Sequence, residues 1–206
     1  MLLFAALIAA YLFGSLSGSL LLGRLVGVDI RACGSGNAGG TNAFRTLGWR
    51  FALGVVLIDI GKGTLAAALG QWLAGDVAWL PAACVLAAVA GHTWPVFFGF
   101  RGGKGAATLV GGLAWLWPAA LLPLVAVWVL VVTTTGYVGL ATVLAALLLP
   151  LLAALIEPSL TRLAFATISA GFILYTHREN LRRLRQGREH RFERARILWL
   201  LFRKAG

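Results

Sequence analysis

Residues suited to binding phosphate gather in one glycine-rich stretch, GSGNAGGTNAFRTLG, which runs from Gly34 to Gly48. Its five glycines let the backbone turn tightly and direct N–H groups outward. Short polar side chains and one fixed cation stand among them: Ser35, Asn37, Thr41, Asn42 and Arg45. Because backbone N–H groups and a guanidinium together bind phosphate oxygens, the stretch predicts a phosphate site.

A competing interpretation comes from the pattern G-x-G-x-x-G at Gly34, Gly36 and Gly39, which is typical of dinucleotide-binding folds. That fingerprint requires a preceding β-strand within a βαβ unit. Here the polar segment Asp29-Ile30-Arg31 precedes it, and the acidic residue at a suitable distance, Asp59, lies inside a long apolar run. The dinucleotide interpretation is therefore rejected. A flexible loop is the other alternative, but the density of Asn, Thr and Arg favours phosphate binding.

A second polar segment, GHTWPVFFGFRGGKG, runs from Gly91 to Gly105 and repeats the theme. Its Gly102-Gly103-Lys104-Gly105 turn places a lysine at the start of a helix, where backbone N–H groups have no partner within the helix. No Ser or Thr stands directly after the lysine, so the segment is not a Walker A loop. Arg101 fits a phosphate contact and a lipid headgroup contact equally well, and we interpret His92 as structural.

A third polar segment, from His177 to Asn180, follows the last apolar run. His177 could act as a general base or donate a hydrogen bond to phosphate. A histidine at the C-terminus of a helix also interacts favourably with the helix dipole, which is the plainer interpretation. Because three polar segments converge on one membrane face around a surplus of cations, we favour the functional role.

Composition excludes a soluble globular domain and predicts an all-α polytopic membrane protein. The 206 residues are 60% hydrophobic and 12% charged, whereas soluble domains are about a quarter charged. The net charge of +11 could indicate a nucleic-acid partner, but the excess of Lys and Arg at the cytoplasmic face of membrane proteins explains it, and we expect no nucleic acid. Cys33 and Cys84 lack metal-ligand spacing, so we expect neither a metal nor a cofactor.

Apolar runs predict seven transmembrane helices. The segment from Gly105 to Ile156 has no charged residue, and as one helix it would extend ~78 Å against a hydrocarbon core of ~30 Å. We expect Pro118 and Pro123 to divide it once, and the turn at 133–136 to divide it again. The fourth span, 105–117, is then short. The other expected spans are Leu2–Leu22, Phe51–Leu69, a third from about Trp72 or Val77 to Ala90, and Leu163–Thr176.

The distribution of charge predicts the orientation. With seven spans, all of the eighteen lysines and arginines except Lys62 and Arg162, that is sixteen, fall on one side. We expect the N-terminus outside and the C-terminus in the cytoplasm, in a single integral membrane domain over residues 1–206. Its basic cytoplasmic tail, 177–206, should include a helix over 178–196 that lies on anionic headgroups and an interfacial anchor at 197–202.

Two charged residues, Asp59 and Lys62, lie inside the second expected span. They are three positions apart on one helical face, so they can pair with each other or with a polar loop. Charges within a membrane indicate a functional role by default. We favour a structural pair that positions the glycine-rich segments.

The three polar segments together resemble the cytoplasmic motifs of the PlsY family, the bacterial acyl-phosphate:glycerol-3-phosphate acyltransferases. The matching stretches are Ser35–Gly48, Gly91–Thr108 and His177–Asn180, with shorter matches at Asp29-Ile30-Arg31, at Asp59 with Lys62-Gly63, and at Gly187–His190. The resemblance covers nearly the whole chain, to about Phe192. It implies seven transmembrane helices in the bacterial inner membrane, an active site facing the cytoplasm, and formation of lysophosphatidic acid without a metal or cofactor.

The resemblance also implies partners and residue roles. Acyl phosphate would transfer its acyl group to the 1-hydroxyl of glycerol 3-phosphate at the phospholipid bilayer, and a peripheral enzyme would supply the acyl phosphate. The expected catalytic residues are Ser35, Lys104, His177 and Asn180. The expected substrate-binding residues are Gly36, Asn37, Gly40, Thr41, Asn42, Arg45, Arg101, Gly102, Gly103 and Thr142, of which Gly40, Thr41 and Asn42 match the part that would hold the acyl phosphate.

One stretch departs from the family pattern. The family usually has Arg-Tyr-Val-Ser where this chain has Gly136-Tyr137-Val138-Gly139, and it often has Ser where this chain has Thr142. Thr142 keeps a hydroxyl group at this position. The missing Arg and Ser call a substrate contact from this loop into question.

The chemistry of an acyl phosphate suits these residues. An acyl phosphate is a mixed anhydride whose leaving group departs without a proton, so the enzyme must hold two anions together and stabilise developing charge. Arg45 and Lys104 would offset the repulsion between the two phosphates. The proton of the 1-hydroxyl would pass to His177 or to a substrate phosphate. We identify no Ser-His-Asp set, and no covalent acyl-enzyme is required.

A transporter of an organic phosphate or anion is the alternative function, since intramembrane charges and helices broken by Gly or Pro suit one. Transporters usually carry internal repeats and polar sites at the membrane midplane, whereas here no repeat is visible and the polar segments lie at one face. A structural scaffold would leave the convergent cations unexplained. As an acyltransferase, the protein should reject acyl-coenzyme A, because none of its histidines begins the His-x-x-x-x-Asp pair of better-known glycerolipid acyltransferases.

Overall fold

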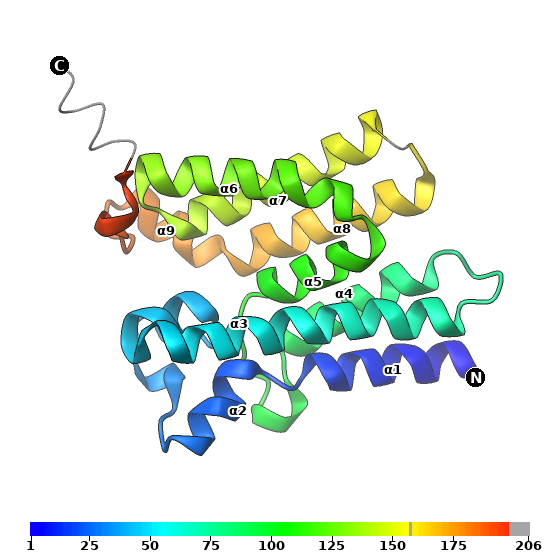
Figure 1. The fold of residues 1–206 in the computed structure, drawn as a ribbon, viewed down its shortest axis with the longest axis horizontal. Helices are drawn as coiled ribbons and strands as arrows, with labels where there is room; N and C mark the ends of the chain where they lie inside the picture. Colours follow the sequence, from blue (N-terminus) through cyan, green and yellow to red (C-terminus); the bar gives the residue numbers. More distant parts are fainter. Residues whose placement is uncertain (157, 198–206) are drawn as a thin grey trace. The chain divides into compact units, whose positions relative to one another are not determined.

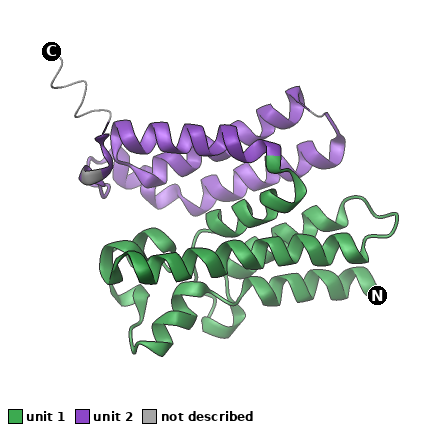
Figure 2. Cartoon of the chain, viewed as in Figure 1, with its two compact units in different colours: residues 1–118 green, residues 119–206 purple. Residues whose placement is uncertain are grey.

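The computed structural model describes residues 1–156 and 158–197, and within these ranges the chain is helical and contains no β-strand. It forms two compact units, residues 1–118 and 119–206 (Figure 2). Of the expected interfacial anchor at 197–202, all but Ile197 lies outside the described residues. Figure 1 labels the helices in chain order.

The first unit contains five α-helices in its described residues. They are α1 (Leu2–Gly14), α2 (Gly18–Leu25), α3 (Gly40–Leu73), α4 (Leu80–Thr93) and α5 (Ala106–Leu116), with single 3₁₀ turns at Ile30–Ala32 and Val96–Phe98. Helix α3 packs against α1, α2, α4 and α5, and α1 packs lengthwise against α4 (Figure 1). The glycine-rich stretch and the second polar segment therefore both emerge from helices that contact α3.

The second unit contains four α-helices in its described residues. They are α6 (Leu121–Thr135), α7 (Val138–Leu155), α8 (Leu160–Thr176) and α9 (Arg178–Arg185), with 3₁₀ turns at Pro118–Ala120, where the unit begins, and at Glu193–Ala195. Helix α7 packs against both α6 and α8. Ser159 caps α8 by accepting a hydrogen bond from the backbone N–H of Arg162 at 3.1 Å, which fixes the start of that helix.

Four helical segments are long and apolar enough to cross a membrane: Gly40–Leu73, Leu80–Phe98, Pro118–Thr135 and Val138–Leu155. The bent pair α1 and α2 makes a fifth when it is counted as one span. Helices α5 and α8 are apolar but shorter. The protein is thus an all-helical membrane protein with four or five candidate spans in its described part.

The first expected span, Leu2–Leu22, is broken in the structure. Helix α1 ends at Gly14 and α2 begins at Gly18, with a bend of 46° between them. The break frees backbone groups of the connecting residues: the Leu16 carbonyl accepts a hydrogen bond from Lys62 Nζ at 3.2 Å, and the Gly18 N–H donates to Asp59 Oδ1 at 3.1 Å. The break therefore provides two backbone partners for the charged pair on α3, which lies far away in the sequence.

Other boundaries agree with the sequence patterns. The chain is divided near Pro118 and again at Gly136, which adopts a left-handed φ of 79° at the end of α6. Pro123, in contrast, lies within the first turn of α6 and does not interrupt the helix.

The basic tail helix is shorter than expected, because α9 stops at Arg185. Gly187, with φ of 67°, donates to the Leu184 carbonyl, and Arg188 donates to the Arg183 carbonyl, which is the Schellman pattern that terminates helices.

Small residues bring α1 and α4 into close contact. A Cβ atom added at Gly91 would lie 2.1 Å from the Tyr11 carbonyl oxygen, and one added at Gly14 would lie 2.1 Å from the Ala88 carbonyl oxygen. The buried cluster at this contact is rich in alanine: it includes Ala6 and Ala10 of α1 and Ala88 of α4, together with Ala66 of α3 and Ala74 at its end. Close approach of backbones is the usual way in which helices associate within lipid.

Replacing Gly91 with alanine should therefore destabilise the protein. The new methyl group meets backbone atoms of α1, which cannot rotate away, and overpacking of this kind costs about 1–3 kcal/mol. Gly61→Ala on α3 is the matched control, because its Cβ would meet nothing within 4 Å. Thermal unfolding in detergent should show a lower midpoint for Gly91→Ala and an unchanged or higher midpoint for Gly61→Ala. Equal midpoints would contradict the packing described here.

Candidate functional site

The glycine-rich stretch is held in shape by the buried side chain of Asn42. Its Oδ1 accepts a hydrogen bond from the Ser35 N–H at 2.9 Å, and its Nδ2 donates to the carbonyls of Ile30 at 3.1 Å and Cys33 at 2.9 Å. The turn at Gly34 leaves no space for a side chain, since an added Cβ would lie 2.3 Å from Asn42 Oδ1. All polar atoms of the Asn42 amide are thus committed to the stretch itself.

The second half of the stretch is helical, which the sequence analysis did not anticipate. Helix α3 begins at Gly40, with Gly39 as its N-cap, and it is interrupted at Gly48 by a non-helical backbone with φ of 84° and ψ of 178°. The N–H groups of Gly40, Thr41 and Asn42 therefore lie at a helix N-terminus, where the helix dipole favours anions. Thr41 and Arg45 are exposed beside them, as is Ser35.

The second polar segment forms another helix N-terminus in the same unit. Gly105, with a left-handed φ of 85°, is the N-cap of α5, and Lys104 immediately precedes it. The turn before Lys104 pairs with the end of α4: the Gly102 N–H donates to the Thr93 carbonyl and the Gly103 N–H donates to the His92 carbonyl, both at 3.1 Å. A Cβ at Gly102 would lie 2.0 Å from the His92 carbonyl oxygen, so this pairing requires glycine.

Arg31 joins the two glycine-rich segments. Its guanidinium donates to the Phe98 carbonyl at 2.9 Å and to the Arg101 carbonyl at 3.2 Å, and it forms an ion pair with Asp29 at 2.8 Å. The hydrogen bonds between the two side chains hold the pKa of Asp29 below its usual range and raise that of Arg31. The segments also meet at Ala38, whose carbonyl oxygen lies 2.7 Å from the position of a Cβ at Gly103.

A buried charged cluster lies behind these segments. Lys62 Nζ is 2.9 Å from Asp59 Oδ1 and 2.8 Å from His92 Nδ1, and His92 Nδ1 is 3.4 Å from Asp59 Oδ1. All three side chains are at most 5% exposed. The predicted Asp59–Lys62 pair is therefore confirmed, and the His92 ring is the third member of the cluster.

In the second unit, the buried His177 has a defined ring orientation. Its Nδ1 lies 2.9 Å from the Ile173 carbonyl oxygen. A carbonyl oxygen can only accept a hydrogen bond, so Nδ1 must carry the hydrogen. In the neutral ring, Nε2 is then the nitrogen that can accept a proton, which is the arrangement that a general base requires.

Asn180 is fixed by the tail that follows α9. Its Nδ2 donates to Glu189 Oε1, and the other carboxylate oxygen of Glu189 accepts from Arg183 Nε at 2.7 Å. Gly139 of α7 packs directly on this asparagine, since an added Cβ would lie 2.8 Å from Asn180 Nδ2. In this chain, the Asn180 side chain therefore occupies the space that a side chain at position 139 would need.

The chain also departs from the family pattern at Gly136 and Thr142, and the structure shows what each of these residues contacts. Gly136 has a left-handed φ, and a Cβ there would lie 3.0 Å from Arg191 Cγ and 3.1 Å from Arg196 Cδ. The Thr142 hydroxyl donates to the Val138 carbonyl at 2.9 Å and accepts from Trp128 Nε1 at 3.2 Å. The Arg191 and Arg196 side chains thus occupy the space beside Gly136, and the Trp128 side chain donates a hydrogen bond to the Thr142 hydroxyl.

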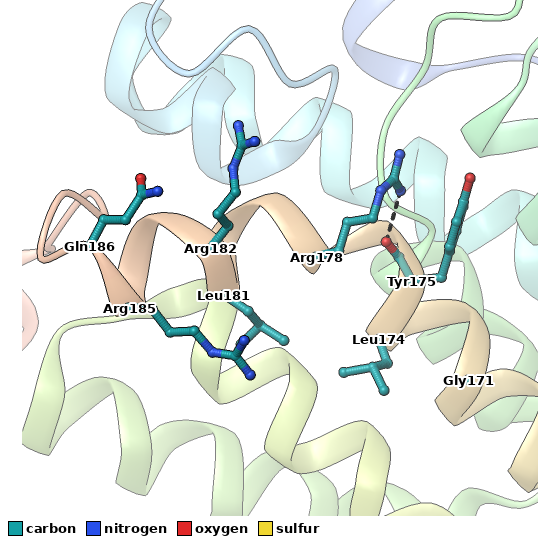
Figure 3. Close-up of a pocket in the computed structure, with 8 residues that line it drawn as sticks. All are labelled: Gly171, Leu174, Tyr175, Arg178, Leu181, Arg182, Arg185 and Gln186. Carbon is teal, nitrogen blue, oxygen red and sulfur yellow. Dashed lines mark hydrogen bonds between the residues drawn. The ribbon is translucent and has the colours of Figure 1, made fainter.

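A basic hollow of about 630 Å³ lies along one side of α8 and α9. Its polar wall consists of Arg178, Arg182, Arg185 and Gln186, and its remaining lining consists of Gly171, Leu174, Tyr175 and Leu181 (Figure 3). The Arg178 guanidinium stacks 4.2 Å from the centre of the Tyr175 ring and donates to the Tyr175 carbonyl at 2.9 Å. The lining thus combines three arginines with apolar side chains.

Sequence reasoning placed the polar segments but missed several of the residues that shape them. These residues are Arg31, Asn42 and Glu189. Their hydrogen bonds link residues that are far apart in the sequence or belong to loops. The short motifs that contain Arg31 and Glu189 were the available signal. No pattern along the chain connects His92 with Lys62, because thirty positions separate them.

Comparison with known proteins gives a consistent result. A family model described as glycerol-3-phosphate acyltransferase matches residues 4–187. The glycerol-3-phosphate acyltransferase of Azotobacter vinelandii is 46% identical over 90% of this chain and 97% of its own length. That of Geotalea daltonii is 42% identical over 91% and 96%, and that of Thermus thermophilus is 41% identical over 92% and 95%.

Two solved structures share the fold. Both are crystal structures of PlsY, described as an integral membrane glycerol 3-phosphate acyltransferase. The glycerol 3-phosphate form is 38% identical, with a TM-score of 0.87 over 92% of this chain and 95% of the other. The lysophosphatidic acid form is 37% identical, with a TM-score of 0.86 over 97% and 98%.

Asn42→Asp tests whether this side chain holds the glycine-rich stretch. The substitution keeps the size of the side chain and the acceptor for the Ser35 N–H. It removes both donated hydrogen bonds and places a carboxylate oxygen opposite two carbonyl oxygens. This should lower the free energy of unfolding by at least about 2 kcal/mol. Hydrogen exchange of residues 30–36 should accelerate and the melting midpoint should fall. Asn37→Asp is the control for stability, because the Asn37 side chain makes no hydrogen bond among the described residues. Unchanged exchange in Asn42→Asp would contradict the assignment.

Proposed function

The chain belongs to the glycerol-3-phosphate acyltransferase family, and from this premise we propose that its acyl donor is an acyl phosphate. The protein is an integral membrane acyltransferase of phospholipid synthesis that acylates glycerol 3-phosphate to lysophosphatidic acid. The observation that carries this conclusion is the family match over residues 4–187, because that range includes all three polar segments. The proposed acceptor atom is the oxygen of the 1-hydroxyl.

The reaction proposed for this site is a direct acyl transfer. The 1-hydroxyl oxygen attacks the carbonyl carbon of the acyl phosphate, a new C–O ester bond forms, and the bond from that carbon to the phosphate oxygen breaks. Phosphate leaves with the electron pair of that bond, and the hydroxyl proton passes to His177 Nε2 or to a substrate phosphate oxygen. No metal or cofactor takes part in the proposed steps, and the main requirement is to hold two anions together.

We assign phosphate binding to the first unit. The N–H groups of Gly40, Thr41 and Asn42 at the start of α3 are suited to the acyl phosphate. Asn42 would contribute only its backbone, because its side chain is committed to the stretch. The remaining groups assigned to substrate in this unit are Ser35, Gly36, Asn37, Arg45, Arg101, Gly102, Gly103 and Lys104. Of these, Arg45 and Lys104 would neutralise the two phosphates.

We assign His177 and Asn180 to the reacting hydroxyl, as the family motif implies. The Nδ1–H tautomer of His177 leaves Nε2 as the proton acceptor, and Glu189 and Gly139 fix the Asn180 amide. Thr142 is the weakest of the proposed contacts, because its hydroxyl already makes two hydrogen bonds within this unit. A substrate contact from Thr142 would therefore require one of these bonds to break.

We propose seven transmembrane helices in the bacterial inner membrane, with the N-terminus outside and the active site facing the cytoplasm. The four long segments, the bent pair counted as one span and the two shorter apolar helices α5 and α8 add up to seven spans, which supports this number. The charge distribution supports the orientation. The basic hollow on α8 and α9 would then contact anionic headgroups, and a peripheral enzyme would deliver the acyl phosphate.

An assay with purified protein tests the donor and the phosphate-binding groups together. Labelled glycerol 3-phosphate should yield lysophosphatidic acid with acyl phosphate and none with acyl-coenzyme A, and strong chelation should leave the rate unchanged. Lys104→Ala and Arg45→Ala should each lower kcat/KM by an amount equivalent to about 2–4 kcal/mol, because each removes a cation from a site that holds two phosphates. Product from acyl-coenzyme A alone would refute the proposed donor, and a near-normal rate in either variant would refute its assigned role.

Cysteine labelling tests the topology. After Cys33 and Cys84 are replaced, single cysteines near positions 76 and 158 should react with an impermeant reagent from outside intact cells. Single cysteines near positions 38, 102 and 190 should react only after the membrane is opened, because the cation-rich segments face the cytoplasm. Labelling of position 190 from outside would exclude the seven-span arrangement.

A further inference from the structure

We propose that His92 is a positioning residue, held by Asp59 and Lys62 in the tautomer with its hydrogen on Nε2, and that its ring sets the contact between the two glycine-rich segments. This inference deepens the proposed function and rests on it for the kinetic measurement only. The tautomer itself is a physical property that can be measured in the full-length protein without any activity.

The surroundings of Lys62 determine the tautomer. A lysine ammonium has three hydrogen-bond donors and no acceptor. Three acceptors surround Nζ: Asp59 Oδ1 at 2.9 Å, the Leu16 carbonyl at 3.2 Å and His92 Nδ1 at 2.8 Å. The match between donors and acceptors makes His92 Nδ1 an acceptor, so in the neutral ring the hydrogen must be on Nε2.

The alternative tautomer fits the distances less well. With the hydrogen on Nδ1, His92 would donate to Asp59 Oδ1, but these atoms are 3.4 Å apart, and a donor would face Lys62 Nζ at 2.8 Å. The proposed state also leaves the buried cluster without net charge, because one carboxylate balances one ammonium and the ring is neutral. Buried charges are stable only when they are paired and hydrogen-bonded in this way.

The far side of the ring faces the meeting point of the two segments. A Cβ added at Gly103 would lie 2.2 Å from His92 Nε2 and 2.7 Å from the Ala38 carbonyl oxygen. The Nε2 edge of the ring therefore occupies the space beside Gly103, close to the place where the two segments meet. Within residues 1–156 and 158–197, no hydrogen bond of His92 uses Nε2.

The backbone of His92 contacts the same turn. Its carbonyl accepts the Gly103 N–H at 3.1 Å, one residue before Lys104. A single residue of α4 thus contacts the turn through its carbonyl and through its ring, while the other ring nitrogen is bound to the charged pair on α3. A shift of the ring would move Gly103, and Lys104 would move with it.

Nitrogen NMR of ¹⁵N-histidine-labelled protein in detergent tests the tautomer directly. The chain has three histidines, and the variants His177→Asn and His190→Gln identify the signals of the other two. The expected spectrum shows His92 neutral, with a protonated Nε2 and an unprotonated Nδ1. A protonated Nδ1, with Nε2 either protonated or not, would overturn the proposal.

Two substitutions separate the ends of the ring. Asn at position 92 places an amide oxygen near Nδ1 and keeps the acceptor for Lys62, but it removes the group that faces Gly103. Gln places its amide near Nε2 and restores a donor there. We expect His92→Asn to lower kcat/KM by about tenfold to a hundredfold, as misplacement of a catalytic group does, and we expect His92→Gln to recover part of this loss.

Thr64→Val is the matched control, because it removes a part-buried hydrogen bond on α3, from Thr64 Oγ1 to the Gly111 carbonyl at 3.0 Å. It should lower the melting midpoint while leaving kcat/KM of the folded enzyme unchanged. If His92→Asn lowers the midpoint no more than Thr64→Val does but loses activity, the ring acts in positioning. Wild-type kcat/KM in His92→Asn, or a loss in Thr64→Val as large as that in His92→Asn, would overturn the proposal. If His92→Asn does not fold, the NMR spectrum decides alone.

Discussion

The arrangement of the first unit depends on one buried ion pair, Asp59 and Lys62, within an apolar helix. Removing two charges from water costs several kcal/mol per ion even after relaxation, so every polar atom around such a pair must find a partner. The break between α1 and α2 provides two of these partners, the Leu16 carbonyl and the Gly18 N–H. His92 provides another. The irregular backbone between two helices thus supplies hydrogen-bond partners for charges on a third.

Glycine serves two different purposes in this protein. At Gly14, Gly63, Gly91 and Gly111 it permits helices to approach until backbone atoms touch, and each of these contacts would be lost with any side chain. At Gly102 and Gly105 it shapes the turn that leads into α5, by pairing with α4 at the first position and by a left-handed φ at the second. The first polar segment of this unit contains the N-terminus of α3 and the second leads into that of α5, where unpaired N–H groups and the helix dipole favour an anion. The phosphate binding that we propose for this unit would therefore rest on backbone geometry, to which Arg45 and Lys104 would add charge.

In the second unit, side chains of the tail and of α8 and α9 hold the candidate site residues in place. Glu189 joins Arg183 and Asn180, and the Ile173 carbonyl determines the tautomer of His177. Gly136 and Gly139, which differ from the usual family residues, lie against the Arg191 and Arg196 side chains and against Asn180 respectively. A change at either position would displace a neighbour, so these glycines belong to the packing of this particular chain.

The sequence by itself determined the all-helical membrane class, the three polar segments and the family, because apolar run length, glycine spacing and cation density are properties of the chain read in order. It also placed the divisions near Pro118 and Gly136, where local backbone preference decides. Tertiary structure decided the rest. The bend at residues 15–17, the helical second half of the glycine-rich stretch, the joining role of Arg31 and the place of His92 beside Lys62 all depend on contacts between distant residues. No local pattern encodes such contacts, because a buried polar group is satisfied by whichever partner the packing of the helices brings within hydrogen-bonding distance.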